Sequence, residues 1–290
     1  MYLLDKRSDL GWQAADPVRR PVLFVNPRSG DGKAARVRIA ERAREMAIEV
    51  VTFHDGQNLA AAASGAVAAG ADVLGVAGGD GSLAPVAAAA AAHNVPFVCV
   101  PSGTRNHFAR DLGIDPRDPI GALDAFTDGV ERLIDMGEVN GRRFLNNVSL
   151  GIYGDAVRRP EYRDAKARTL WDTADEVLGP SGRAPDLRLV DDLGCQHRHP
   201  AVLLVSNNPY ALRGPLISGR RPALDSGQLG VILLKTPNTS PRFPGREWTT
   251  PRLEVEAPGP VHAGIDGEAV ELDPPLRFAS RPAQLRIRVR

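Results

Sequence analysis

Three glycine-containing turns in the first half of the chain carry residue types suited to binding phosphate. They lie at residues 26–30, 78–82 and 101–106, and each follows a short run of β-branched and apolar residues. Glycine lets the backbone approach phosphate oxygens closely, and the backbone N–H groups of such turns act as hydrogen-bond donors. Because strand-end turns of one parallel sheet open into one crevice, we expect these three turns to form a single nucleotide site.

The motifs in these turns are specific enough to indicate a family. They read Asn-Pro-x-Ser-Gly at 26–30, Gly-Gly-Asp-Gly-Ser at 78–82 and Ser-Gly-Thr-x-Asn-x-Phe-Ala-Arg at 102–110, and further matches lie at 135–146 and at Ile-Asp-Gly-Glu, 265–268. With them the chain resembles the catalytic domain of diacylglycerol and sphingosine kinases, including bacterial lipid kinases. The resemblance implies ATP-dependent phosphorylation of a hydroxyl on a diacylglycerol-type or long-chain substrate, with Mg²⁺. The alternative is a nucleotide-binding protein of the same fold with little or no kinase activity, a sensor or a remnant.

The residues expected to bind the nucleotide lie in the three turns and beside them. They are Asn26, Pro27, Arg28, Ser29, Gly30, Thr52, Gly78, Gly79, Gly81, Ser82, Thr104, Arg105, Asn106 and Arg110. Thr104 is also expected to cap a following helix, which is compatible with anion binding because the same N–H groups serve both. For Arg110 the alternative is a solvated surface arginine, and Lys166 is a candidate to reach the phosphates from the second domain.

Two other phosphate motifs are less consistent with the sequence. Residues 30–34 are similar to a Walker loop, but the first glycine is misplaced and Ala34 stands where a magnesium-binding Ser or Thr is needed. Residues 79–84 fit the dinucleotide pattern G-x-G-x-x-A. That pattern also needs an acid about twenty residues further on for the ribose, and no Asp or Glu occurs between Asp80 and Asp111. A dinucleotide oxidoreductase is therefore the less favoured interpretation.

Three acidic residues are candidates for the chemical step. Asp80 could be a turn aspartate that bonds its own backbone, but beside three glycines we favour a role in binding magnesium near the phosphates. The resemblance implies that an acid of the Asp266-Gly267-Glu268 motif accepts the proton of the attacking hydroxyl. We favour Asp266 as the base and Glu268 as support, because an alcohol is a poor nucleophile until its proton is removed. The alternative is a tight hairpin turn.

The departures from the family pattern cluster around the expected metal. A histidine, His107, replaces a carboxylate, one of two consecutive acids is missing at 224–227, and Ala84-Pro85 replaces an Asn-Glu pair. Asp80, Asp135 and Asp225 remain as the predicted metal ligands. Each lost carboxylate weakens an oxygen-ligand site, so we expect either a different substrate or weak or lost activity. His197 and His199 are expected in an exposed turn, where no further ligand completes a metal set.

The composition is that of a soluble globular protein. Of 290 residues, 43% are hydrophobic and 24% are charged, and the net charge of +1 gives no reason to expect a nucleic-acid partner. Two distant cysteines fit a cytoplasmic protein, with Cys99 as a small core residue. The alanine-rich stretch 59–79 is interrupted by polar residues and glycines, so any membrane contact is expected to be peripheral. The expected partners are a nucleotide and a lipid or other hydroxyl-bearing small molecule.

The pattern of strands and helices predicts two domains after an N-terminal extension at 1–20. Residues 21–137 alternate strand and helix, which predicts an α/β nucleotide-binding domain with a parallel sheet. Residues 138–290 read as an antiparallel β-sandwich, and the last strand is a candidate to return to the first domain. This is the plan of lipid kinases and NAD kinases. Expected strands lie at 22–25, 49–53, 73–77, 97–100, 131–139, 142–150, 187–190, 201–205, 229–234, 253–256, 262–265 and 285–289, and expected helices at 33–47, 59–69, 106–112, 120–127 and 165–178. The helix at 33–47 is expected to have Val37, Ala40, Ala43 and Ala47 on one face. Pro85 is expected in the first turn of the helix after 73–77, and Asn140-Gly141 predicts a hairpin between 131–139 and 142–150.

Overall fold

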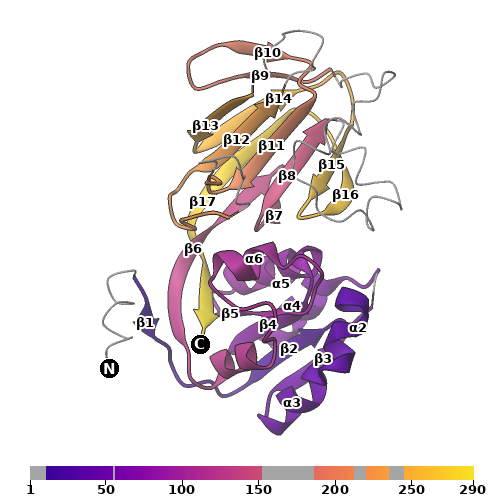
Figure 1. Cartoon of the computed structure of the whole chain (residues 1–290), viewed down its shortest axis with the longest axis vertical. Coiled ribbons are helices and arrows are strands. Elements are labelled where there is room, and N and C mark those ends of the chain that lie inside the picture. The colour runs from indigo at the N-terminus through magenta and orange to yellow at the C-terminus, as the bar shows by residue number, and fades with distance from the viewer. Residues whose placement is uncertain (1–10, 55, 152–185, 212–219, 235–244) are drawn as a thin grey trace. The chain divides into compact units, whose positions relative to one another are not determined.

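The computed structural model describes residues 11–54, 56–151, 186–211, 220–234 and 245–290. The chain divides into two compact units, which are coloured by position along the chain in Figure 1. Unit 1 comprises Met1–Ile134 together with Ala283–Arg290, and unit 2 comprises Asp135–Pro282. The expected helix at 165–178, with Lys166, lies outside the described residues.

The sheet of unit 1 is parallel, as the alternation of strand and helix predicted. Its order is β17-β5-β4-β2-β3, and each neighbouring pair runs parallel. The central strands β2, β4 and β5 are apolar on both faces because helices cover both sides of the sheet. The bounds of the parallel strands are β2 Pro21–Val25, β3 Glu49–Thr52, β4 Val73–Gly78, β5 Phe97–Pro101 and β17 Leu276–Val289. A short strand, β1 (Gln13–Ala14), pairs antiparallel with β6 (Val130–Val139).

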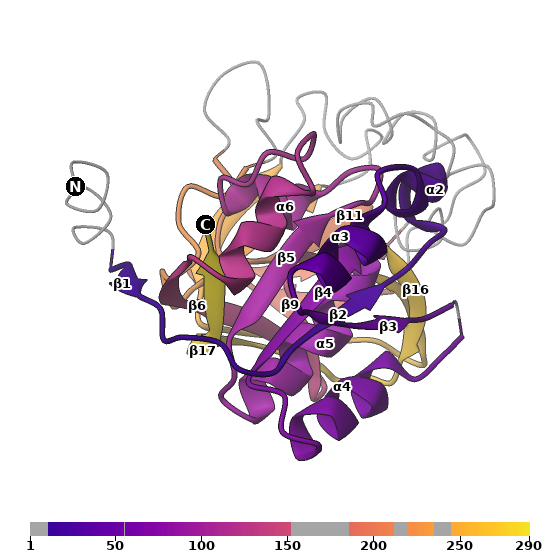
Figure 2. The same ribbon diagram turned by 90° about the horizontal axis from the view of Figure 1, so that it is seen from below.

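Helices pack on the two faces of this sheet, as the view in Figure 2 shows. Apolar residues of α2, α3 and the 3₁₀ helix η1 form one core with alternate residues of the strands. Helices α4 and α5 contact each other, and α5 contacts β4. The bounds are α2 Ser29–Arg36, α3 Ile39–Glu45, α4 Leu59–Ala68, α5 Asp80–Ala92, α6 His107–Asp111 and η1 Gly121–Phe126.

Two details of the predicted helices are wrong. The single helix at 33–47 is divided at Arg38, which adopts a left-handed φ of 54°. This break changes the phase, so Ile39 and Ala43 are buried whereas Val37 and Ala47 of the expected apolar face are exposed. Helix α5 begins at Asp80, so Pro85 lies in its second turn rather than its first. Because proline has no N–H, the bond that would reach the Gly81 carbonyl is absent.

Unit 2 is a sandwich of antiparallel strands. One sheet has the order β13-β12-β11-β8-β15-β16, and β10-β9-β14 pairs with the first half of β17. Apolar residues from both sheets form one core. The bounds are β7 Arg142–Phe144, β8 Asn147–Gly151, β9 Arg188–Val190, β10 Gln196–Arg198, β11 Val202–Asn207, β12 Leu229–Leu234, β13 Arg246–Thr250, β14 Arg252–Glu256, β15 Val261–Ile265 and β16 Glu268–Leu272.

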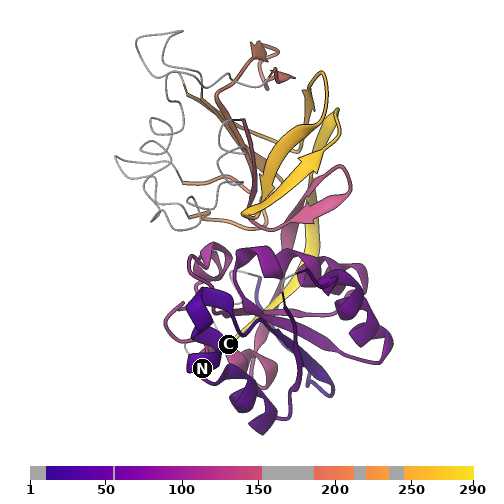
Figure 3. The ribbon, with the colours of Figure 1, turned by 90° about the vertical axis from the view of Figure 1, so that its right-hand side faces the viewer.

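The last strand belongs to both units. Residues near the start of β17 pair antiparallel with β14, and Ile287 pairs in parallel with Phe97 of β5. Figure 3 shows this strand, in yellow, running on into the parallel sheet. The chain therefore crosses between the units at two strands, β6 and β17. None of the helices in the described residues is both long and apolar enough to cross a membrane.

The predicted hairpin at Asn140-Gly141 is confirmed, since β6 and β7 pair directly across these two residues, which both have positive φ. The prediction for His197 is wrong. This residue lies in β10 and is buried, because Asp191 supplies a hydrogen-bond partner for its ring. The sequence pattern also missed the strands β10, β13 and β16. These strands are short, and their polar and apolar residues do not alternate regularly.

Candidate functional site

The three glycine-containing turns meet backbone to backbone in unit 1. A Cβ atom built on Gly30 would lie 2.4 Å from the Ser102 carbonyl oxygen, and one built on Gly103 would lie 2.4 Å from the Gly79 Cα. A Cβ on Gly79 would lie 3.7 Å from the Ser29 Oγ. Turns 26–30, 78–82 and 101–106 are thus in direct contact, and the predicted convergence is confirmed. Glycine is required at 30 and 103 because no side chain fits between the backbones.

The first turn is formed by Asn26 and directs the chain into α2. The Asn26 Oδ1 accepts a hydrogen bond of 3.0 Å from the Arg28 N–H, and the Asn26 carbonyl accepts one of 3.1 Å from the Ser29 N–H. Asn26 is buried and its own N–H donates to the Ala77 carbonyl at the end of β4. The side chain of Asn26 therefore shapes the first turn, and its backbone N–H ties that turn to the strand that leads into the second.

Asp80 lies in the first turn of α5 and binds the start of another helix. Its Oδ2 accepts a 3.2 Å hydrogen bond from the His107 N–H, and its Oδ1 accepts one of 3.2 Å from the Phe108 N–H. These are N–H groups of the first turn of α6, which lack partners within their own helix. The carboxylate thus bonds the backbone of the third motif rather than that of its own turn. Its negative charge also suits a helix N-terminus.

The third turn is closed by Asn106, which adopts a left-handed φ of 53°. Its Oδ1 accepts from the Gly103 N–H at 2.9 Å, and its Nδ2 donates to the Gly103 carbonyl at 2.7 Å. The cap predicted for Thr104 is wrong, because Asn106 is the N-cap residue and Thr104 is exposed. In the same turn, the Ser102 hydroxyl is buried and has no hydrogen-bond partner among the described residues.

Burial keeps two side chains near Asp80, those of His107 and Cys99, uncharged. Burial lowers the pKa of His107, and Arg105 and Arg110 lower it further, while Asp80 opposes them. His107 is therefore a neutral imidazole at pH 7. Burial and, secondarily, Asp80 raise the pKa of Cys99, whose thiol stays protonated and packs as the predicted small core residue.

The remaining predicted nucleotide residues lie around the turns. Gly81 and Ser82 occupy the first turn of α5, and Thr52 is exposed at the end of β3. Arg105 is half-buried, whereas Arg110 is exposed in the last turn of α6. The exposure of Arg110 fits both a surface arginine and a residue that contacts a ligand.

The Asp266-Gly267-Glu268 motif forms the tight hairpin turn that was the alternative interpretation. Ile265 pairs with Glu268 across a two-residue loop in which Asp266 and Gly267 have φ values of 49° and 88°. The Asp266 carboxylate is buried and accepts backbone N–H bonds from Leu145 (2.8 Å), Asn146 (2.7 Å) and Asn147 (3.1 Å). Glu268 is exposed. The two acids therefore have different surroundings, and Asp266 fixes the bend between β7 and β8.

The predicted metal ligands of unit 2 are Asp135, on β6, and Asp225, in the loop 224–227 that Asp135 contacts. They differ in exposure. Asp135 is buried, its Oδ2 accepts a 2.7 Å bond from the Gly227 N–H, and its N–H donates to the Leu224 carbonyl at 2.8 Å. Asp225, in the same loop, is exposed. Within the described ranges, no three His, Cys, Asp or Glu side chains are grouped so that they could bind a metal ion. The metal roles assigned to Asp80, Asp135 and Asp225 therefore stay predictions.

Sequence reasoning missed a buried arginine that organises the same region. Arg221 donates to the Leu145 carbonyl (2.5 Å), the Asn207 carbonyl (2.8 Å) and the Asn146 Oδ1 (2.8 Å). The Nδ2 of buried Asn207 in turn donates to the Asp135 carbonyl at 2.9 Å. One signal in the sequence could have indicated this region: the polar pair Asn207-Asn208 follows the apolar run 201–205. Asp266 and Arg221 thus bind the 145–147 segment through its N–H groups and its carbonyl and amide oxygens.

The fold and site define a class: an α/β domain whose strand-end glycine turns converge, followed by an antiparallel sandwich. Residues 20–139 match the family model described as the diacylglycerol kinase catalytic domain. The chain is 32% identical over 295 residues to the "Probable lipid kinase YegS-like" of Pseudomonas aeruginosa strain PAO1, covering 92% of this chain and 93% of the relative. The chain therefore belongs to the YegS-like and diacylglycerol kinase family of lipid kinases.

Two further relatives agree with this assignment. A diacylglycerol kinase of Mycobacterium tuberculosis is 37% identical over 124 residues, which is 40% of this chain and 39% of that protein. The crystal structure of a diacylglycerol kinase from Bacillus anthracis superimposes with a TM-score of 0.65 at 16% identity, covering 95% of this chain and 98% of that one. At that identity the similarity shows the fold.

Proposed function

We propose that the protein is an ATP-dependent phosphotransferase that phosphorylates a hydroxyl of a diacylglycerol-type or long-chain lipid. The observation that carries this proposal is the direct contact of the three glycine turns at Gly30, Gly79 and Gly103. Close-packed turns beside a helix N-terminus present backbone N–H groups to an anion. The start of α5 at Asp80 supplies that helix N-terminus.

The chain's own residues would bind and orient the triphosphate. Backbone N–H groups of residues 26–30 and of the first turn of α5 would donate to phosphate oxygens, with Arg105 and Arg110 as nearby positive charges. The family implies a divalent ion, which neutralises phosphate charge in such transfers. Within the described residues no three His, Cys, Asp or Glu side chains are grouped for a metal, so we derive no step through this ion.

The proposed proton acceptor is a carboxylate of the 266–268 motif. Asp266 already accepts three backbone hydrogen bonds, whereas Glu268 is exposed. We therefore assign Asp266 the positioning of the 145–147 segment in addition to the candidate role of base. A general base has to reach the hydroxyl within about 3 Å or through one water molecule.

The structural hydrogen bonds of Asp80 and Asp266 support a second candidate function. Asp80 binds the start of α6 and Asp266 binds the 145–147 segment, so both acids have structural roles that a protein without catalysis would retain. The second candidate is therefore a nucleotide-binding protein of this fold with little or no kinase activity.

Thermal unfolding with nucleotide, followed by transfer of labelled phosphate to a panel of lipids, separates these functions. ATP at a hundredfold its Kd should stabilise the protein by about 2.7 kcal/mol. Gly81→Val should abolish this shift, while Gly65→Val is the matched control because Gly65 lies in α4 with open space around it. A shift without transfer would favour the second candidate. The absence of any shift at millimolar nucleotide would contradict both.

A further inference from the structure

The hairpin formed by β9 and β10 displays apolar side chains on the surface of unit 2. Leu193 in its turn is 73% exposed and Val190 at the end of β9 is 52% exposed. They are two of the four large apolar side chains that stand out as exposed in the described part of the chain. Single exposed apolar residues are ordinary, but two at one tip mark a surface that contacts something apolar.

The turn that carries Leu193 is fixed from inside by Asp191. The Asp191 Oδ1 accepts hydrogen bonds of 2.9 Å from the N–H groups of Leu193 and Cys195. Its Oδ2 accepts the His197 Nε2–H at 2.7 Å and also pairs with Arg246. His197 stacks on Trp248 with ring centroids 6.3 Å apart. The tip is therefore held in one conformation rather than being a loose loop, which lowers the entropy cost of binding.

The acids close to the tip are neutralised within the protein. Arg246 pairs with Asp192 at 2.5 Å as well as with Asp191. Asp186, at the base of the hairpin, pairs with Arg188 at 3.0 Å and lies 3.7 Å from His199. Because these acids are paired, the tip presents apolar surface with little uncompensated negative charge beside it.

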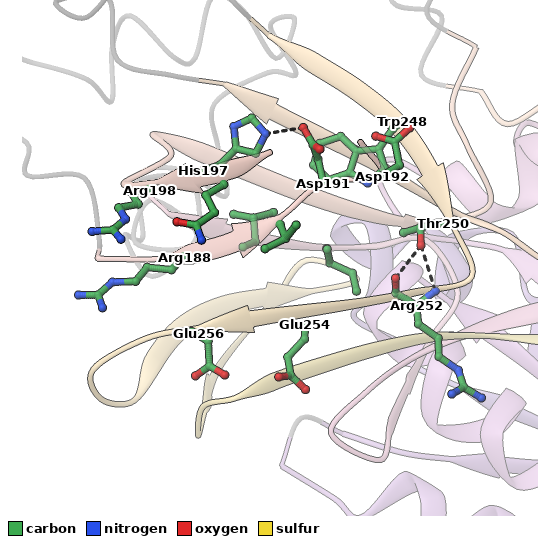
Figure 4. A pocket seen from close by; sticks show the side chains of 14 residues that line it. Arg188, Asp191, Asp192, His197, Arg198, Trp248, Thr250, Arg252, Glu254 and Glu256 are labelled. Atoms are coloured by element: carbon green, nitrogen blue, oxygen red, sulfur yellow. Dashed lines mark hydrogen bonds and ion pairs between the residues drawn. The ribbon is translucent and has the colours of Figure 1, made fainter. Parts of the chain in front are cut away.

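Two arginines stand side by side on the same face as Val190. Arg188 and Arg198 are directly opposite in the ladder, and both are exposed. Figure 4 shows the two side chains extending together from the hairpin, with Glu254 and Glu256 on the neighbouring strand. Glu254 pairs with Arg277, and Glu256 is in register with Arg188. Arg198 forms no ion pair within the described ranges. Arg188 is paired with Asp186, so of these two arginines Arg198 is the one placed to bind an external anion.

We propose that the β9–β10 hairpin docks the protein on an anionic phospholipid surface. Leu193 and Val190 enter the acyl boundary, and Arg198 contacts lipid phosphates, which guanidinium groups bind in a forked geometry. The choice of a membrane over a protein partner rests on the proposed function, because a lipid kinase has to reach a substrate that resides in a bilayer. The combination of an apolar tip with an arginine behind it matches the layering of acyl chains and phosphates.

Co-sedimentation of the full chain with vesicles of phosphatidylcholine and phosphatidylglycerol tests this. Leu193→Asp should weaken vesicle binding about tenfold or more, since burial of a leucine is lost. Leu133→Asp is the matched control, because Leu133 is 49% exposed but lies in unit 1 on β6. Equal binding by the two variants, or no binding by the unaltered protein, would overturn the proposal.

The role of Arg198 in binding lipid phosphates is tested by removing its charge. Arg198→Gln should weaken binding to the anionic vesicles about fivefold and binding to pure phosphatidylcholine much less, since a basic residue near an anionic surface contributes about 1 kcal/mol. Arg142→Gln, at an exposed position of another hairpin, is the control and should change neither. An equal effect of both substitutions would overturn the assignment of Arg198.

A label on the unaltered chain avoids any doubt about folding of the variants. Cys195 is exposed in the hairpin turn and Cys99 is buried, so a polarity-sensitive dye should attach at Cys195 alone. Its emission should shift to the blue when vesicles are added, and an unchanged spectrum would count against the proposal. Turnover of a short-chain acceptor dissolved without vesicles separates the two proposals. Leu193→Asp should leave it unchanged, and an unaltered protein that binds vesicles but transfers no phosphate would contradict only the proposed function.

Discussion

Asp266 shows how one side chain connects two segments that lie far apart in the sequence. Its carboxylate accepts the N–H groups of three successive residues, 145–147, about 120 positions earlier in the chain. Successive N–H groups can point to one anion only where the backbone bends, and that bend separates β7 from β8. Replacing the carboxylate therefore changes the shape of the 145–147 segment as well as removing a candidate base.

Asp266→Asn should lower the free energy of unfolding by about 2 kcal/mol, because buried N–H groups lose a charged acceptor. We also expect turnover to fall roughly 10²–10⁴-fold if Asp266 is the base. Glu268→Gln is the control in the same hairpin, and it should leave stability unchanged because Glu268 is exposed. Urea unfolding and steady-state kinetics measure the two effects. Unchanged stability of Asp266→Asn would contradict the structural role.

At the scale of elements, the candidate nucleotide site depends on turns that pack without side chains between them. Gly103→Ala should destabilise unit 1 by about 2 kcal/mol, because the new methyl group would lie 2.4 Å from the Gly79 Cα. Gly79→Ala is the matched control, since its methyl group would lie at an ordinary 3.6 Å from Gly103. Thermal unfolding of the two variants compares them directly. Equal melting temperatures would show that the turns are not in close contact.

The β9–β10 hairpin should confer a pH dependence on unit 2. Burial by itself raises the pKa of Asp191, but hydrogen bonds from His197, Cys195 and Leu193 and the Arg246 charge lower it to about 2. The ordinary value is 3.8. Because the pKa is lower in the folded state, the stabilisation is complete above pH 4 and is lost as the pH falls toward 2.

Asp191→Asn should therefore be less stable than the unaltered protein at pH 7, and the difference should shrink between pH 4 and pH 2. Urea midpoints at pH 7, 4 and 2.5 measure it. Asp225→Asn removes an exposed carboxylate in the same unit and should show no such dependence. A constant difference for Asp191→Asn at all three pH values would contradict the lowered pKa.

At the scale of the whole molecule, the end of the chain completes the first unit. Leu285 and Ile287 are fully buried, and Arg288 is 2% exposed. The Arg288 guanidinium donates to the carbonyls of Ala125 (2.6 Å) and Asp16 (2.8 Å) and pairs with Glu131 at 3.2 Å. Two distant segments of unit 1, one at residue 16 and one at 125–131, thus bind one arginine of its last strand.

Truncation after Pro282 should unfold unit 1, because removal of the buried strand costs on the order of 5 kcal/mol, comparable to the stability of a domain. The thermal shift with nucleotide should disappear with it. Removal of Arg290 alone, an exposed residue, is the control and should cost much less. Near-ultraviolet circular dichroism and calorimetry would follow the loss. A truncated chain that melts like the full one would show that β17 is dispensable.

Much of the fold could be predicted because the hydrophobic pattern is local. The apolar runs at 22–25, 73–77 and 97–100 are strands in the structure, and Asn140-Gly141 forms the expected hairpin. Predicted helix boundaries were wrong where a left-handed residue interrupted the helix and shifted its apolar face, as at Arg38. The strands β10, β13 and β16 were missed because their polar and apolar residues do not alternate regularly, and they become strands by pairing with β9, β12 and β15.

The sequence by itself determined the family, the parallel sheet and the convergence of the glycine turns, since glycine spacing after apolar strands needs no knowledge of distant contacts. Tertiary structure alone decided what the polar side chains do. Asp80 bonds α6, Asp266 bonds 145–147, and Arg221 is buried at the centre of a hydrogen-bond network. The physical reason is that a buried polar group has to find partners, and those partners come from segments far away in the chain.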